Sequence, residues 1–203
     1  MIKRLMLFDL DGVLLDSKDN MRKSWAHVLE RTNLKIPFED YFSRIGRPFK
    51  DIMIDLGVSY DLEKIEKIYM AASFDFLEEV MFFPNVKDTL HQLHNSGIKL
   101  GIVTSKDKLR TNAVLQQFDI PLVTIQSPSE RYRGKPAPDS LMIAMAEAGE
   151  DPSDTLYIGD MSTDYEAARR AGIDYIHASW GYGEPIKLVD SIRNISDLLR
   201  YIL

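Results

Sequence analysis

Short apolar runs alternate with helical patterns along most of this chain, and this alternation constrains the fold more than any other feature. The apolar runs are continuous, which is typical of parallel strands that are buried on both faces. Several helical patterns between them end at a glycine, such as Gly97, Gly149 and Gly172. The sequence therefore predicts an α/β fold with a doubly wound parallel sheet. The expected strands span residues 4–9, 98–105, 121–126, 155–160 and 174–179.

One long segment breaks the alternation. From about residue 17 to residue 83 the sequence contains helical stretches but no convincing strand. This is too long for a single crossover helix, so we expect a helical domain inserted after the first strand, with a return hinge near Pro84. The predicted organisation is a core domain of residues 1–15 and 84–203 and an inserted domain of residues 16–83.

Composition argues against several classes of protein. The 203 residues include 25 Lys and Arg against 31 Asp and Glu, a formal charge of -6, which argues against nucleic-acid binding. There is no cysteine, so disulfides and thiol chemistry are excluded. The first residues lack the apolar core of a signal peptide, and no apolar run approaches the ~20 residues of a membrane span. We expect a cytoplasmic protein that binds neither nucleic acid nor membrane.

Polar side chains stand where several expected strands end. In an open parallel sheet, ligands bind beyond the carboxyl ends of the strands, so these side chains are expected to meet at one edge. A lysine from a loop ahead of a predicted helix joins them. The set comprises Asp9 and Asp11, Thr104 and Ser105, Asp160 and Asp164, and Lys135.

This combination of residue types indicates a reaction. Crowded carboxylates repel one another unless a cation neutralises them, and Mg²⁺ suits a few carboxylates together with water and substrate phosphate. A lysine and a hydroxyl group serve an anion, such as a phosphoryl group, bound opposite the metal. The set therefore predicts phosphoryl transfer. In the Asp9–Asp11 pair, one carboxylate can attack phosphorus while the other protonates the leaving oxygen and later activates water.

Four motifs, in order over nearly the whole chain, resemble those of the haloacid dehalogenase-like superfamily of phosphatases. They are FDLDGVLLDS, GIVTS, RGKPAPD and IGDMSTD. The helical insertion resembles the C1 cap of that family, and the late segment SWGYGEP is similar to phosphoglycolate phosphatases and pyrophosphatases. The resemblance implies a Rossmann-like core, a Mg²⁺ cofactor, an aspartyl-phosphate intermediate and a small phosphorylated metabolite as substrate.

The resemblance also implies roles for the acidic residues. Asp9 matches the nucleophile, which is also a metal ligand. Asp11 matches the general acid/base, whose backbone carbonyl also reaches the metal. Asp160 matches a metal ligand, and Asp164 completes the acidic motif as a direct or supporting ligand.

The remaining matches concern the phosphate and the rest of the substrate. Thr104 matches the phosphate-binding hydroxyl group, and Lys135 the lysine that neutralises nucleophile and phosphate. Gly12 would let backbone amides approach the phosphate, to which Ser105 would add its hydroxyl group or its amide. Arg47, in the cap loop RIGRPFKD, is either a contact for a second anionic group or a solvated loop charge, and Lys106 is equally open.

Other functions remain as alternatives. The β-phosphoglucomutase group carries a histidine where this chain has Met21, which favours hydrolysis over a phosphomutase. True haloacid dehalogenases have a non-acidic residue in place of Asp11. A non-catalytic, phosphate-binding regulatory protein is the other alternative, although a pure binder has no reason to keep an acid/base beside a nucleophile. Trp180 and Tyr182 are expected to pack at the edge of the sheet.

Overall fold

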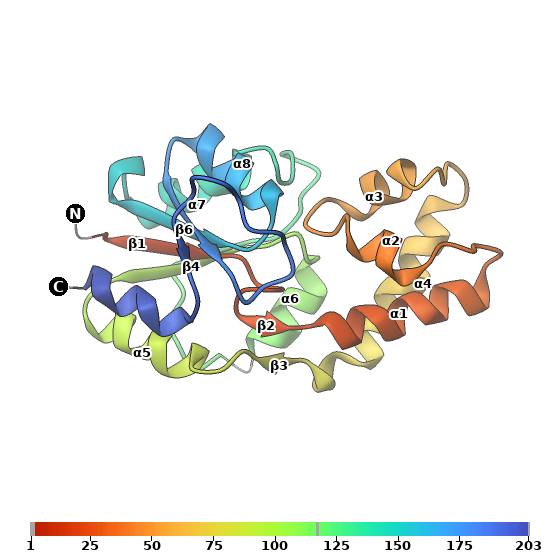
Figure 1. Cartoon of the computed structure of the whole chain (residues 1–203), viewed down its shortest axis with the longest axis horizontal. Helices are drawn as coiled ribbons and strands as arrows, with labels where there is room; N and C mark the ends of the chain where they lie inside the picture. The colour runs from red at the N-terminus through yellow and green to blue at the C-terminus, as the bar shows by residue number, and fades with distance from the viewer. Residues whose placement is uncertain (1–2, 117, 203) are drawn as a thin grey trace.

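A parallel sheet forms the centre of the protein. The computed structural model describes residues 3–116 and 118–202. Its strands follow the order β5–β4–β1–β6–β7–β8, and all neighbouring pairs are parallel (Figure 1). The predicted doubly wound sheet is thus confirmed. The strands are β1 (Leu5–Phe8), β4 (Lys99–Val103), β5 (Thr124–Gln126), β6 (Thr155–Gly159), β7 (Asp174–Ala178) and β8 (Ser191–Ile192).

Helices cover both faces of the sheet. Neighbouring residues of β1 point to opposite faces, so Met6 and Phe8 enter one apolar cluster while Leu5 and Leu7 enter another. Continuous apolar strands follow from this double burial. The first face packs on α5 (Val86–Asn95), α6 (Lys108–Leu115) and the 3₁₀ segment η3 (Ile195–Tyr201). The second face packs on α7 (Asp139–Ala148) and α8 (Ser162–Ala171). A 3₁₀ turn, η2 (Pro152–Asp154), precedes β6.

The insertion after the first strand is helical and lies beside the sheet (Figure 1). Its helices pack around a third apolar cluster that includes Trp25, Tyr41 and Tyr69. The rings of Trp25 and Tyr41 are stacked, with centroids 4.4 Å apart. The segment comprises α1 (Lys18–Arg31), α2 (Phe38–Phe42), α3 (Phe49–Asp55), α4 (Leu62–Asp75) and the 3₁₀ turn η1 (Leu77–Glu79).

A short antiparallel ribbon joins the insertion to the sheet. It pairs β2 (Leu15–Asp16) with β3 (Met81–Phe82), and Pro84 lies two residues after the second strand. The expectation of no strand between residues 17 and 83 was therefore wrong for β3, because two residues are too few to show a periodicity.

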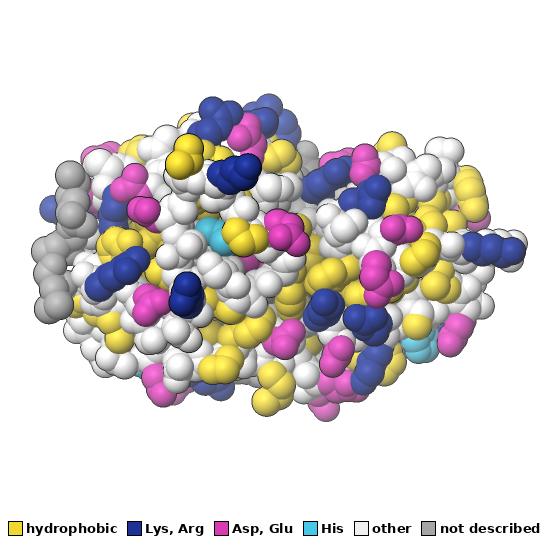
Figure 2. Space-filling view, in the orientation of Figure 1, with side chains coloured by type: hydrophobic (Ala, Val, Ile, Leu, Met, Phe, Trp, Pro, Cys, Tyr) yellow, Lys and Arg dark blue, Asp and Glu magenta, His cyan; other side chains and the backbone are white. Residues whose placement is uncertain are grey.

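Within residues 3–116 and 118–202, no helix combines the length and the apolar character that a bilayer crossing needs. On the face drawn in Figure 2, basic and acidic side chains are interspersed.

Candidate active site

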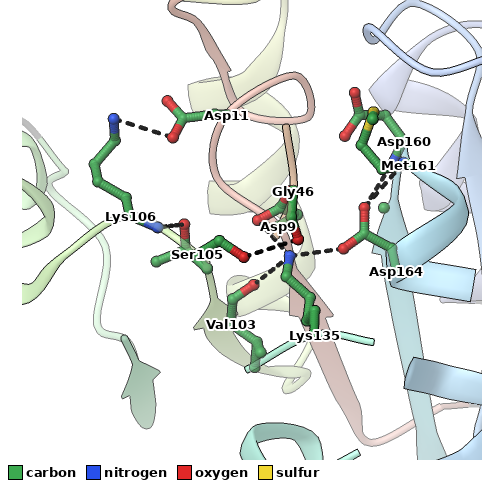
Figure 3. A network of polar contacts seen from close by, with 12 residues as sticks. Asp9, Asp11, Gly46, Val103, Ser105, Lys106, Lys135, Asp160, Met161 and Asp164 are labelled. Atoms are coloured by element: carbon green, nitrogen blue, oxygen red, sulfur yellow. Dashed lines mark hydrogen bonds and ion pairs between the residues drawn. The ribbon is translucent and has the colours of Figure 1, made fainter. Parts of the chain in front are cut away.

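The predicted site residues gather where the central strands end. Asp9 follows β1, Thr104 follows β4 and Asp160 follows β6. These strands are neighbours in the sheet, since β1 lies between β4 and β6. Lys135, from the loop before α7, reaches into the same place (Figure 3). The order of the strands therefore brings together residues that are far apart in the sequence.

Lys135 is the centre of a buried ionic network. Its Nζ atom lies 2.9 Å from a carboxylate oxygen of Asp9 and 2.6 Å from one of Asp164 (Figure 3). It also donates to the Tyr157 hydroxyl group at 3.0 Å and to the Val103 carbonyl at 3.4 Å. Burial opposes the charge of Lys135, but Asp164 and Asp9 more than compensate and raise its pKa above the ordinary value. Lys135 is therefore a fixed cation.

The acids around Lys135 resist ionisation. Burial raises the pKa of Asp9 to about 7, an effect that Lys135 opposes and Asp164 reinforces. Burial, reinforced by Asp164 and Asp9, holds the pKa of Asp160 well above its ordinary value. Oxygens of these three carboxylates all lie within 4.8 Å of one another. One lysine is too little positive charge for so compact a group of acids.

Asp164 has a different place from the other acids because all its lone pairs are engaged. One oxygen accepts from Lys135 and, at 2.9 Å, from the Tyr157 hydroxyl group. The other accepts from the backbone amides of Asp160 at 3.2 Å and Met161 at 2.9 Å, at the start of α8. Asp164 thus fixes Lys135 and the backbone of Asp160, which favours a supporting role over direct metal ligation.

The donor set fits a hard divalent cation. One oxygen of Asp160 accepts from the Tyr182 amide at 2.7 Å. The other Asp160 oxygen, and one of Asp11, are buried without a hydrogen-bond partner among the described residues. Oxygen atoms of this kind are the ligands that Mg²⁺ takes in proteins. Asp9 and Asp160 are the residues best placed to hold it.

Gly12 is needed because Asp160 leaves no room for a side chain. Its φ is +88°, and a Cβ atom there would lie 2.3 Å from an oxygen of Asp160. The Gly12 amide donates to the Leu15 carbonyl at 2.9 Å, which closes the loop after β1. The glycine thus shapes the loop that carries Asp11.

Asp11 is turned toward Lys106 (Figure 3). The Lys106 Nζ atom lies 3.0 Å from the Asp11 carboxylate, and both side chains line the same cavity. Burial lowers the pKa of Lys106, and Asp11 offsets part of this effect. The Thr104 hydroxyl group accepts from the Lys106 amide at 3.1 Å, so one short loop positions both residues.

A cavity of about 80 Å³ lies between the sheet and the inserted helices. The inserted helices contribute mainly apolar and aromatic side chains, including Met21, Tyr41 and Tyr69. The Ser105 hydroxyl group donates to the Gly46 carbonyl at 3.1 Å, so the loop before α3 is held against the sheet. The sheet side carries Met161 and, mainly, charged and hydroxyl groups: Asp9, Asp11, Thr104, Ser105, Lys106 and Arg110.

Arg47 lies at this cavity, but its guanidinium group contacts its own helical segment. It lies 3.7 Å from the Asp55 carboxylate and donates to the Asp51 carbonyl at 3.2 Å. The structure thus brings Asp9, Asp11, Thr104, Ser105 and Arg47 to one cavity. Lys135, Asp160 and Asp164 are buried behind Asp9.

Comparison with known proteins identifies the family. Residues 6–178 match the family described as haloacid dehalogenase-like hydrolase. The chain belongs to this family. The prediction made from the four motifs is therefore confirmed, and the chain is a hydrolase.

Its relatives include both of the predicted subgroups. The chain is 30% identical over 183 residues to the pyrophosphatase PpaX of Oceanobacillus iheyensis, a match that covers 87% of this chain and 84% of the relative. It is 30% identical over 195 residues to a phosphoglycolate phosphatase of Aquifex aeolicus, covering 88% and 86%. A crystal structure of a candidate phosphoglycolate phosphatase from Lactobacillus plantarum superposes with a TM-score of 0.91 at 21% identity, covering 99% and 100% of the two chains, which shows the same fold.

Sequence reasoning missed several residues of this candidate site. Tyr157 was read only as part of a buried strand, although its hydroxyl group donates to Asp164 and the Val103 carbonyl. Trp180 does pack on the core as expected, and its indole N–H donates to the Val13 carbonyl at 3.0 Å. Tyr182 does more than pack, since its amide holds Asp160 and its hydroxyl group accepts from the Ser17 amide at 2.6 Å. The only signal was the pair of glycines around Tyr182 in SWGYGEP.

We expect Gly12→Ala to lower the free energy of unfolding by about 2–4 kcal/mol and to abolish hydrolysis, because the new methyl group collides with Asp160 at a left-handed backbone position. Gly97→Ala is the matched control. Its φ is +86°, but a Cβ atom there meets nothing within 4 Å, so it should cost only about 1–2 kcal/mol and leave turnover intact. Urea unfolding and phosphate release measure both variants. Equal losses would show that only the backbone angle matters.

Without divalent metal, the hydrolase should lose stability as pH rises from about 4 to about 7. Over this range the unfolded chain has released the Asp9 proton while the folded protein, with a pKa of about 7, retains it. The folded state binds more protons, so the free energy of unfolding falls with pH and levels off above pH 7. Bound Mg²⁺ would replace these protons and remove this dependence of the free energy of unfolding on pH. Thermal unfolding between pH 5 and 8, in EDTA or in Mg²⁺, tests this; a melting temperature in EDTA that does not fall would contradict it.

Proposed function

We propose that this chain is a Mg²⁺-dependent phosphatase that hydrolyses a small phosphorylated metabolite through an aspartyl-phosphate on Asp9. The observation that carries the proposal is the position of the Asp9 carboxylate. It lines the cavity on one side and is held by the buried cation Lys135 on the other. The Thr104 hydroxyl group and the Asp11 carboxylate line the same cavity.

These residues account for both chemical steps. An oxygen of Asp9 attacks phosphorus and the bond from phosphorus to the ester oxygen breaks, while Asp11 gives its proton to the leaving oxygen. Asp11 then takes a proton from water, the water oxygen attacks phosphorus, and the bond to Asp9 breaks to release phosphate. The Thr104 hydroxyl group holds a phosphoryl oxygen in the cavity, while Lys135, on the far side of Asp9, offsets the negative charge of Asp9 and of the phosphoryl group that Asp9 receives. A bound Mg²⁺ would supply further neutralisation of the carboxylates and the phosphoryl group.

Residues 16–83 would act as a cap domain over this site. The hydrogen bond from Ser105 to the Gly46 carbonyl supports this assignment, as does the apolar lining that the helices give the cavity. A closed cap keeps bulk water away from the aspartyl-phosphate and strengthens the electrostatic contacts inside. Closure would therefore belong to the catalytic cycle.

The cavity supports a small substrate. Its volume of about 80 Å³ is far below the ~300–1,000 Å³ typical of sites for drug-sized ligands. The similar proteins named pyrophosphatase and phosphoglycolate phosphatase suggest substrates of that size. A sugar phosphate would need the cap to open further.

A phosphomutase is the second candidate function, and the residue at position 21, Met21, argues against it. Met21 lines the cavity at the position where the β-phosphoglucomutase group has a histidine. A thioether is only a weak hydrogen-bond acceptor and cannot assist proton transfer as an imidazole does. Net hydrolysis is the better match.

Phosphate release from a panel of substrates tests the proposal. The panel contains 2-phosphoglycolate, pyrophosphate, a nucleoside monophosphate, a hexose phosphate and p-nitrophenyl phosphate, each with Mg²⁺ or with EDTA. We expect release that requires Mg²⁺ and is fastest for one of the two smallest metabolites. Isomerisation of the hexose phosphate without release would indicate a mutase. Phosphate binding without any turnover would indicate the regulatory protein.

A further inference from the structure

Arg110 is a buried cation in the cavity wall that the proposed mechanism does not use. It comes from the first turn of α6 on the sheet side, and its side chain is only 10% exposed. The Nε atom pairs with the carboxylate of Asp107, the N-cap residue of the same helix. Burying a guanidinium group is costly unless it is paired, and this one is paired on the side of Asp107 alone among the acids of the described residues.

The charged side chains that line the cavity differ in where their ionic partners lie. Asp9 and Asp11 are the acids of its lining, and they serve the reaction itself. Of the bases in the lining, Lys106 is bound to Asp11 and Arg47 to its own segment. Arg110 has its carboxylate partner outside the lining, since Asp107 does not border the cavity. An anion that enters would therefore meet positive charge at Arg110.

The guanidinium group is also fixed in place. Its Nη1 atom donates to the Ser73 hydroxyl group of α4 at 2.7 Å, and the Ser73 hydroxyl group donates to the Asn20 side-chain carbonyl at 2.7 Å. The group lies 5.6 Å from the centre of the Tyr69 ring, which also lines the cavity. These contacts use only some of the five N–H donors of the Arg110 guanidinium group. A preorganised arginine in a water-poor site is well suited to bind a carboxylate or a phosphoryl group.

We infer that Arg110 is the specificity-determining residue that binds a second anionic group of the substrate. The inference rests on the proposed phosphatase function, in which the first anionic group is the phosphoryl group at Asp9. It assigns the second group to the sheet side of the cavity, at α6, in place of the loop residue Arg47. Because Arg110 also holds Ser73, an anion bound there would favour the closed position of the inserted helices.

Two substrates of similar size distinguish a role of Arg110 in substrate recognition from a purely structural role. 2-Phosphoglycolate carries a carboxylate where 2-hydroxyethyl phosphate carries a neutral hydroxyl group. Arg110→Met should lower kcat/KM for 2-phosphoglycolate by about 10- to 100-fold, the range for hydrogen bonds to charged groups, and that for 2-hydroxyethyl phosphate by less than about threefold. Pyrophosphate tests whether a phosphoryl group is recognised in the same way. Arg110→Lys should restore part of the lost discrimination.

Ser73→Ala provides the structural control, because it removes the contact between α6 and α4 but keeps the guanidinium group. It should affect the charged and the neutral substrate alike. Equal losses for both substrates in Arg110→Met would overturn the inference and leave Arg110 as a structural contact. Loss of discrimination in Arg47→Met but not in Arg110→Met would overturn it as well.

Binding separates failure of this inference from failure of the phosphatase proposal. In an Asp9→Asn background, calorimetry measures the affinity for 2-phosphoglycolate and for 2-hydroxyethyl phosphate without turnover. We expect adding Arg110→Met to weaken binding of 2-phosphoglycolate about tenfold or more and that of the neutral ester little. This result would support the role of Arg110 even if the wild-type protein released no phosphate. Unchanged affinity for 2-phosphoglycolate would overturn it.

Discussion

Asp9→Asn should reduce phosphate release by about 10³-fold or more, because an amide cannot form the acyl phosphate. The same change should leave the protein folded. Lys135 keeps its contact with Asp164, and the amide stands in for a carboxyl group whose pKa burial already raises to about 7. We expect a melting temperature equal to or above that of the wild type, measured by thermal unfolding in EDTA.

Asp88→Asn is the control for this change. Asp88 is an exposed residue in the first turn of α5 and does not line the cavity, so its change should leave the rate unaffected and cost at most about 1 kcal/mol of stability. Near-wild-type release from Asp9→Asn would contradict the nucleophilic role of Asp9. Loss of release together with loss of the folded state would show that Asp9 is needed for structure.

Lys135→Met should have the largest effect on stability. It would leave Asp9, Asp160 and Asp164 buried together without the cation that contacts two of them. Leaving a buried charge unpaired costs about 3–5 kcal/mol, so we expect a loss of that size in urea unfolding without metal. Adding Asp164→Asn should recover part of the loss, because it removes the buried carboxylate that Lys135 had paired. Phosphate release should be lost in both variants.

Lys3→Met is the matched control, because Lys3 is also a buried lysine with an ionic partner. Its partner Asp174 is largely exposed, with a lysine-to-carboxylate distance of 2.6 Å, so no charge is left buried when Lys3 is removed. The expected cost is about 1 kcal/mol. A similar loss for Lys3→Met and Lys135→Met would show that burial of the lysine side chain, and not the acidic cluster, decides the stability.

The sheet could be predicted because its strands are buried on both faces. A run such as Leu5 to Phe8 must be apolar at every position, and this leaves a clear signal. Other elements leave little or none. β8 and β3 have two residues each, and α6 exposes Leu109 while it buries Arg110, so its pattern does not show an apolar face. For these elements tertiary contacts decide the structure.

In the candidate site, too, some residues could be predicted from the sequence and others could not. Asp9, Thr104 and Asp160 stand directly after strands, so the topology of a parallel sheet predicts that they meet. This argument does not predict the roles of Tyr157 and Arg110. Their importance depends on which residues approach them from elsewhere in the chain: Asp164 in the case of Tyr157 and Ser73 in the case of Arg110. Such contacts are not visible in local sequence patterns.

The pairing of β2 with β3 has a consequence for how enzymes of this kind can diversify. Leu15 pairs with Phe82, so the chain leaves the sheet and returns to it at adjacent points. Seen from the sheet, the inserted helices are a loop whose ends are already closed, and the entropy of closing a loop grows only slowly with its length. Replacing or enlarging residues 17–80 would leave the spacing of Asp9, Lys135 and Asp160 unchanged. The apolar side of the cavity, which the inserted helices supply, can then change while Asp9, Lys135 and Arg110 stay in place on the sheet side.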